Sequence, residues 1–250
     1  MPVPRRHRSE PSPQILRALL RLRELILIGE LRPGRRVPEL TLVSAIGVSR
    51  TPLRLAMERL EHEGLLERRP GGGFIVREFT LAEIQDAIEL RGMLEGTAAR
   101  LAAERHGDER ELDGLREVTR RLDAVVRHRV PKLPEFEEYI DLNDQFHRLL
   151  IDLARNPLLR RLIDQVVALP FASPSAFVLA QASDPECHQI MVVGQEHHRA
   201  MAEAIERREG ARAESVAREH ARLALRSLDV ASRDYRAWQK VPGGTLIRLA

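Results

Sequence analysis

The feature of the sequence that most restricts its fold is a helical spacing of apolar residues over most of the chain. Beyond Leu81, apolar residues recur about every 3.6 positions, the period of an α-helix. Aromatic residues make up only 4% of the chain, so the core must be built from Leu, Ala, Val and Ile. Such a core favours helices over sheets. The predicted helices are 81–105, 109–127, 135–154, 157–168, about 186–208 and about 211–232.

The first 80 residues follow a different order of elements. Helical spacing over 14–28, a short helix closed by Gly47 and a third helix over 49–63 are followed by two apolar runs around the turn at 70–73. Three helices and a β-hairpin form a winged helix-turn-helix. The fold class expected for the whole chain is therefore mainly α, with an N-terminal winged helix-turn-helix followed by an antiparallel all-helical bundle.

Four parts are predicted along the chain. The first residues contain proline and arginine but few apolar side chains, so they are expected to form a mobile arm. The last residues fit either a short strand or a docked tail, and the sequence leaves both open. The parts are the flexible arm 1–12, the winged helix-turn-helix domain 13–79, the helical domain 80–232 and the C-terminal tail 233–250.

Charge is divided unevenly between the two halves of the chain. Residues 1–80 hold 15 Lys or Arg against 9 Asp or Glu, whereas residues 81–250 hold 25 against 28. A basic N-terminal part on a mildly acidic body is typical of a DNA-binding head attached to a domain with another role.

Membrane and secreted classes are not expected from this sequence. No run of about 18 apolar residues occurs, and no apolar stretch follows the N-terminal arginines. Cys187 is the only cysteine, so one chain cannot form an internal disulfide. These features predict a cytoplasmic protein without a membrane partner.

Candidate DNA-binding residues gather at the start of the third helix and at the hairpin tip. A helix start presents free amides to phosphate, and an arginine there can donate two hydrogen bonds to guanine. Ser49 is expected to cap the helix through its hydroxyl, and Pro52 fits its first turn. Glycines at the tip would let the backbone approach DNA, although an ordinary turn explains them equally. The residues expected to contact DNA are Ser49, Arg50, Thr51, Pro52, Arg54, Gly72 and Gly73.

Polar residues also interrupt the apolar faces of the later helices. Asn143 and His147 are four residues apart, which is about one helical turn. His198 and His220 are each 11 residues from position 209, where two helices are predicted to meet, so an antiparallel pair would bring them level. Such a cluster could hold Zn²⁺, Ni²⁺ or Fe²⁺. The alternative is three separate core histidines, each with its own hydrogen bond.

The string GVSRTPLRLAMERLEHEGLL, followed by RRPGGGFIV, resembles the DNA-binding domain of the GntR family of bacterial regulators over about residues 14–79. The resemblance implies DNA contacts by Arg50, Thr51 and Arg54, with a glycine at the wing. Leu40 departs from the pattern, because some relatives carry a DNA-contacting arginine there. The operator is therefore expected to differ from theirs.

Residues 82–230 resemble the FCD ligand-binding domain of the FadR-like branch of that family, through IELRGMLEGTAARLAA, NDQFHRLLIDLARNPLL and HRAMAEAIERREGARAESVAREHARL. Many members bind a divalent metal through an Asp or Asn four residues before a His, and through two later His. The resemblance therefore implies a metal, with zinc as the first choice, held by Asn143, His147, His198 and His220. His197 competes with His198, which the alignment favours.

The function expected is a transcription regulator, in this family usually a repressor, that binds double-stranded operator DNA as a homodimer. A small carboxylate effector would bind near the metal. Arg91 could pair with that carboxylate, although a salt bridge to Glu95 is equally expected. The alternative is a metal-dependent hydrolase using the histidine cluster. It lacks a convincing general base, since Glu196 is predicted to lie on the wrong face.

Overall fold

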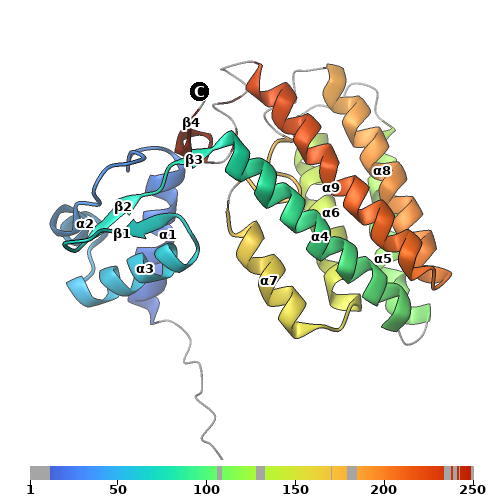
Figure 1. Ribbon diagram of the computed structural model, residues 1–250, viewed down its shortest axis with the longest axis horizontal. Coiled ribbons are helices and arrows are strands. Elements are labelled where there is room, and N and C mark those ends of the chain that lie inside the picture. Colours follow the sequence, from blue (N-terminus) through green and yellow to red (C-terminus); the bar gives the residue numbers. More distant parts are fainter. Residues whose placement is uncertain are drawn as a thin grey trace, which may run out of the picture. The chain divides into compact units, whose positions relative to one another are not determined.

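The computed structural model describes residues 12–105, 109–127, 133–169, 171–178, 185–233, 238, 241 and 243–248. It divides the chain into two compact units, 1–78 and 79–250 (Figure 1). Nearly all of the predicted N-terminal arm lies outside the described residues, as does part of the predicted tail.

The first unit confirms the predicted winged helix-turn-helix. Its hairpin strands are antiparallel, with Leu66 opposite Val76 (Figure 1). The apolar faces of the first and third helices pack together and bury Leu22, Ile26 and Met57. The elements are α1 (Pro13–Leu27), α2 (Glu39–Ile46), α3 (Arg50–His62), β1 (Leu66–Arg68) and β2 (Phe74–Val76).

The turn between α2 and α3 is fixed by a glycine and an arginine. Gly47 ends α2 with a φ of 69°, in the left-handed region that glycine adopts without strain. The Arg17 guanidinium of α1 donates to the carbonyl oxygens of Ile46 and Gly47. A Cβ at Gly47 would lie only 2.7 Å from Nη2 of Arg17. These contacts set where α3 begins relative to the rest of the unit.

The second unit is the predicted helical bundle, and the helix bounds agree with the sequence to within a few residues. In Figure 1, α4 lies along α9, with α8 on the far side of α9. One difference is that residues 109–112 form a 3₁₀ turn ahead of α5. The elements are β3 (Phe79–Thr80), α4 (Leu81–Arg105), η1 (Glu109–Leu112), α5 (Asp113–Val126), α6 (Leu133–Leu153), α7 (Pro157–Val167), α8 (Pro185–Glu206), α9 (Gly210–Ser232), η3 (Gly244–Leu246) and β4 (Ile247–Arg248).

Two glycines let α4 and α9 pack at short distance. A Cβ added at Gly92 would lie 2.8 Å from the Cβ of Ala221, and one at Gly96 would lie 2.7 Å from Cγ of Arg218. A larger side chain at either position would push the helices apart. This close approach brings His220 of α9 towards the polar residues of α4.

The C-terminal tail packs onto the second unit. Its short strand β4 pairs in parallel with β3, with Phe79 opposite Ile247. Trp238 and Leu246 are buried, and the Trp238 indole N–H donates to the Gly244 carbonyl at 3.1 Å. The described residues of the tail therefore combine both alternatives from the sequence, since they are docked and include a strand. No described helix is long and apolar enough to cross a membrane.

Candidate metal centre and nucleic-acid interface

The exposed face of α3 carries most of the predicted DNA-binding residues. Arg50, Thr51 and Arg54 are exposed, whereas Leu53 and Met57 on the opposite face are fully buried. This arrangement follows from the helical spacing of the sequence, and it leaves both guanidiniums on the surface. The DNA contacts themselves stay predictions.

Two residues at the start of α3 differ from the sequence analysis. The prediction that the Ser49 hydroxyl caps the helix is wrong, because the side chain accepts no capping hydrogen bond. Ser49 is still the residue at the N-cap position, and its backbone oxygen accepts from the Leu53 amide at 3.4 Å. Ser49 is exposed. Pro52 lies in the first turn as predicted, but it is buried, so it supports the helix start from inside the unit and does not face DNA as the sequence analysis expected.

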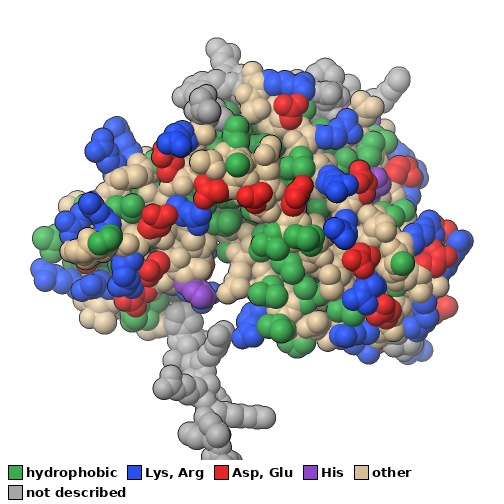
Figure 2. Space-filling model, in the orientation of Figure 1, with side chains coloured by type: hydrophobic (Ala, Val, Ile, Leu, Met, Phe, Trp, Pro, Cys, Tyr) green, Lys and Arg blue, Asp and Glu red, His purple; other side chains and the backbone are tan. Residues whose placement is uncertain are grey.

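A concave surface of about 750 Å³ lies between the first turns of α2 and α3. We call it the head groove. Glu39 Oε2 of α2 lies 4.0 Å from Nε of Arg54 across this groove. Basic side chains are prominent over this unit in Figure 2. The groove is lined by Arg36, Val37, Pro38, Glu39, Leu40, Thr41, Val43, Arg50, Thr51, Leu53 and Arg54.

The hairpin tip requires glycine for its backbone. Gly72 and Gly73 have φ angles of 94° and 81°, which side-chain-bearing residues rarely adopt. A Cβ at Gly72 would meet no atom within 4 Å, so the tip faces open space. The backbone geometry alone explains these glycines, and their approach to DNA stays a prediction.

Three of the predicted metal ligands meet inside the second unit. His147 of α6, His198 of α8 and His220 of α9 are buried, and one ring nitrogen of each lies within 4.8 Å of the others. The ring centroids of His198 and His220 are 4.5 Å apart, as the equal spacing about position 209 predicted. The predicted antiparallel pair of helices has therefore brought these two imidazoles level.

Several ring nitrogens in this cluster are buried without a hydrogen-bond partner. They are both nitrogens of His147, Nε2 of His198 and Nδ1 of His220. Buried polar atoms normally have partners, since leaving one unpaired costs about 1–3 kcal/mol. Unpaired imidazole nitrogens that converge on one point are the donor set of a transition-metal site. The residues present therefore fit a divalent metal ion.

Electrostatics favour the form of histidine that binds a metal. Burial, together with the neighbouring imidazoles, lowers the pKa of His198 and of His220 well below 6.5. Both rings are therefore neutral near pH 7, and each keeps a lone pair. Burial acts to raise the pKa of Glu95, but the charges of His147 and Arg91 outweigh it and lower that pKa to about 2. The carboxylate beside the cluster stays ionised.

Gln195 is a residue of the candidate metal centre that the sequence analysis missed. Its amide nitrogen donates to the Thr119 carbonyl at 2.9 Å and to Asp123. The amide oxygen of Gln195 is therefore the acceptor that faces Nδ1 of His198, at 3.1 Å. This contact places the proton of His198 on Nδ1 and leaves Nε2 for a metal. The signal in the sequence was its position three residues before His198, on the same helix face.

The sequence predicts Glu95 only as a partner of Arg91, yet in the structure it also faces the histidine cluster. Its Oε1 lies 3.3 Å from Nδ1 of His147, close enough for an ionic contact although the geometry is not that of a hydrogen bond. Its Oε2 lies 3.4 Å from Nη1 of Arg91. A carboxylate against the outer nitrogen orients a metal-binding histidine and increases its basicity.

Asn143 lies one turn before His147, and its orientation is set by a serine. Its amide nitrogen donates to Ser175 Oγ at 3.0 Å, and that hydroxyl donates to Asp144 at 2.9 Å. The amide oxygen of Asn143 is thereby left as the atom that could reach a metal. Asp144 is turned towards Ser175, and it is not in the group of converging ligand atoms.

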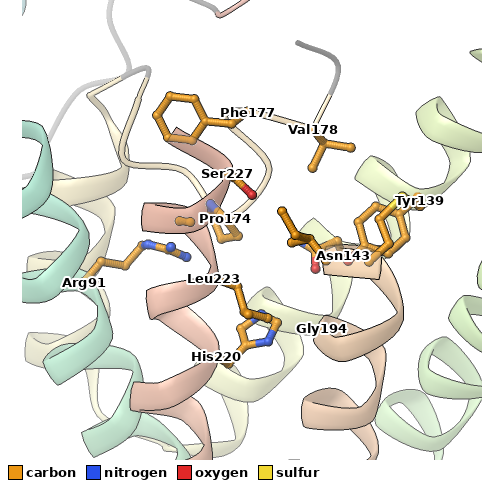
Figure 3. Close-up of a pocket in the computed structure, with 13 residues that line it drawn as sticks. Arg91, Tyr139, Asn143, Pro174, Phe177, Val178, Gly194, His220, Leu223 and Ser227 are labelled. Carbon is orange, nitrogen blue, oxygen red and sulfur yellow. The ribbon is translucent and has the colours of Figure 1, made fainter. Parts of the chain in front are cut away.

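A cavity of about 40 Å³ adjoins the cluster (Figure 3). Arg91 enters it from α4 and His220 from α9, while Asn143 lies on the opposite wall (Figure 3). The Arg91 side chain is buried, and its Nε has no hydrogen-bond partner. The remaining lining residues are mostly apolar and include Phe177, Val178, Leu223 and Ala224.

The two residues that precede His198 in the sequence lie outside the converging group. His197 is partly buried, and its ring centroid is 5.9 Å from that of His220, but its nitrogens do not join the ligand set. Glu196 is exposed and pairs with Arg199. It is therefore on the wrong face to act as a general base, as predicted, and the hydrolase alternative gains no support.

Comparison with known proteins gives matches over both units. The FCD domain model matches residues 86–223, and the model of bacterial regulatory proteins of the gntR family matches residues 14–76. The uncharacterized HTH-type transcriptional regulator YdhC of Bacillus subtilis is 32% identical over 158 residues, which cover 63% of this chain and 68% of that protein.

Two further proteins are similar to this chain. A probable D-xylose utilization operon transcriptional repressor of Paenarthrobacter nicotinovorans is 32% identical over 134 residues, covering 53% of this chain and 56% of that protein. The solved structure of E. coli McbR/YncC has a TM-score of 0.60 at 22% identity, and covers 90% of this chain and 99% of that one. At this identity the structural match shows the fold alone.

Proposed function

Because this chain belongs to the GntR family of bacterial regulatory proteins and carries an FCD domain, we propose that it is a homodimeric repressor controlled by a small organic acid. The acid would bind beside a metal ion in the second unit and change the affinity of the head for operator DNA. The family and the relatives are transcription regulators and not enzymes. The name of the Paenarthrobacter relative supports repression as the direction of control. Since operator DNA is cytoplasmic, the protein would act in the cytoplasm.

The observation that carries the metal proposal is the convergence of unpaired nitrogens from His147, His198 and His220. These residues would hold one divalent ion, with the amide oxygen of Asn143 as a weaker fourth ligand. A set of nitrogen donors with one oxygen suits Zn²⁺, Ni²⁺ or Fe²⁺, and zinc is the first choice. When bound, the ion supplies a positive charge that attracts an anionic group.

Arg91 supports a carboxylate as the effector group. Its guanidinium lines the same cavity as His220, is buried, and has an unpaired Nε. The 3.4 Å contact with Glu95 engages only one of its terminal nitrogens. An effector carboxylate would give the guanidinium a two-point contact in addition to its single contact with Glu95. The small cavity, about 40 Å³, fits a short acid better than a long one.

An exposed apolar face supports the homodimer. Leu90 and Met93 of α4 are 44% and 47% exposed, and Leu158 and Leu162 of α7 are 58% and 43% exposed. The two helices pack against each other, and Figure 2 shows hydrophobic side chains gathered over them. A contiguous apolar patch of this kind marks an interaction surface. A second copy of the chain would cover it and present two heads to a palindromic operator.

The metal and the DNA-binding activities can be tested separately on the full chain. Protein purified without chelator or affinity tag should contain about one equivalent of divalent metal per chain, and it should select a palindromic duplex from a random library. Metal well below one equivalent after reconstitution with zinc or nickel would refute the metal site. Failure to enrich any duplex would refute operator binding, and a purely monomeric protein in sedimentation, with and without DNA, would refute the dimer.

A further inference from the structure

Leu40 is the most exposed large hydrophobic side chain among the described residues, at 67%. It lies in the first turn of α2, where Leu42 and Ile46 bury the other face of the helix. Single exposed leucines are common on protein surfaces and by themselves need no explanation. The position of this one does, because it lies among the residues that would face DNA.

The side chain of Leu40 lines the head groove together with Arg50 and Arg54. The first turn of α2 and the first turn of α3 therefore face one shared space of about 750 Å³. A ligand that fills this groove from the α3 side, as DNA would, also meets Leu40. The leucine methyl groups would then be removed from water by whatever part of the DNA they touch.

The charges around Leu40 indicate which part of DNA that is. The adjacent Glu39 is a carboxylate, and it lies 4.0 Å from Nε of Arg54. The side chains of Glu39 and Leu40 offer no positive charge to a phosphate, so these two side chains suit the base edges better than the DNA backbone. In the major groove, the thymine C5-methyl is the apolar feature that a leucine can contact.

We infer that Leu40 contacts the C5-methyl group of one thymine in each half-site and so helps to determine the operator sequence. This inference rests on the proposed operator binding and names a residue that reads sequence within it. Glu39 would hold the Arg54 guanidinium in the groove beside Leu40. Arginine reads guanine through two hydrogen bonds, whereas the leucine reads thymine through its methyl alone.

The test replaces thymine by deoxyuridine, which removes only the C5-methyl group. A duplex selected by the wild-type protein from a random library is resynthesised with each thymine pair replaced in turn. Wild-type affinity should fall about fourfold at one position of the half-site, the factor that corresponds to burying one methyl group. Leu40→Ala should lose this sensitivity at that position and keep every other base preference.

A matched control is Leu20→Ala, because Leu20 is 54% exposed on α1 and does not line the head groove. This variant should keep the full uracil sensitivity. The inference is overturned if no thymine replacement weakens wild-type binding, or if Leu40→Ala retains the wild-type pattern. If the wild-type protein selects no duplex at all, operator binding itself is overturned. Failure of the Leu40 inference and failure of operator binding therefore give different results.

Discussion

The two units place their polar chemistry in opposite ways. In the head, Arg50 and Arg54 are exposed at the start of a single helix, four residues apart. In the bundle, His147, His198 and His220 are buried and come from three different helices. Substitutions on the exposed face of α3 can therefore change the surface of the head without disturbing its core, whereas the histidine cluster forms only when the whole bundle is packed.

This difference predicts how each region responds to mutation. An exposed side chain on α3 contributes to binding but little to stability, because its environment is already water. A buried ligand contributes to both, because its removal leaves a cavity and unpaired partners.

Replacement of a central histidine should abolish the metal site. His198→Ala removes one of three converging nitrogens, so metal content should fall from about one equivalent to a trace. The head should still fold and bind DNA, since it forms a unit of its own. Elemental analysis and gel shift on the same preparation give the two readouts. The matched control is His197→Ala, which removes the neighbouring imidazole outside the ligand group and should keep the metal. A normal metal content in His198→Ala would contradict the assignment of His198 as a ligand.

Gln195→Ala should weaken metal binding without abolishing it. The variant loses the acceptor that holds the proton of His198 on Nδ1. Loss of such an outer partner typically lowers the metal affinity by about 10- to 100-fold. Competition with a chelator measures the affinity, and nitrogen NMR of the imidazoles reports the change of tautomer. Glu196→Ala is the control, since that side chain is exposed. Unchanged affinity and tautomer would mean that Gln195 is only a packing residue.

The same contrast explains what the sequence could predict. The order of helices and strands in the head could be predicted from the glycines that end its helices. The meeting of His198 and His220 could be predicted from their equal spacing about position 209. For Gln195 the spacing to His198 was a signal, but its orientation depends on partners in α5, and Glu95 meets a partner from α6; only packing brings these elements together. The position of Ser49 at the N-cap was predicted correctly, but the hydrogen bond of its hydroxyl was wrong for a different, local reason. A serine there permits a cap, but local rotation decides whether its hydroxyl turns inward.

A single arginine in the head should have a smaller and purely functional effect. Arg54→Ala should cost about 1–3 kcal/mol of operator affinity and relax the preference at one base pair, if the contact with guanine is bidentate. Thermal stability should stay unchanged because Arg54 is exposed. Arg59→Ala is the control on the same helix, since Arg59 pairs with Glu63. Equal operator affinity of Arg54→Ala and wild type across salt concentrations would remove Arg54 from the interface.

The smallest effect expected is a pH dependence confined to the bundle of the metal-free protein. Burial lowers the pKa of His198 and His220 in the folded state, whereas in the unfolded chain both return towards 6.5. His147 and His197 face His198 and lower its pKa further, while Arg91 and Glu95 act on His220 in opposite directions.

Below pH 6.5 the unfolded chain therefore binds more protons than the folded one, so the free energy of unfolding falls as the pH falls. The slope is at most about 1.4 kcal/mol per pH unit for each proton. Above pH 6.5 both states are neutral at these rings and the stability should be flat. The slope of the unfolding free energy against pH is measured by urea unfolding of the metal-free protein. The window is about pH 5.5 to 8, the range in which histidine titrates. His220→Gln should reduce this slope, because one of the two titrating groups is removed. If the wild-type stability instead rises on acidification, the buried imidazoles are charged in the folded protein and the prediction is wrong.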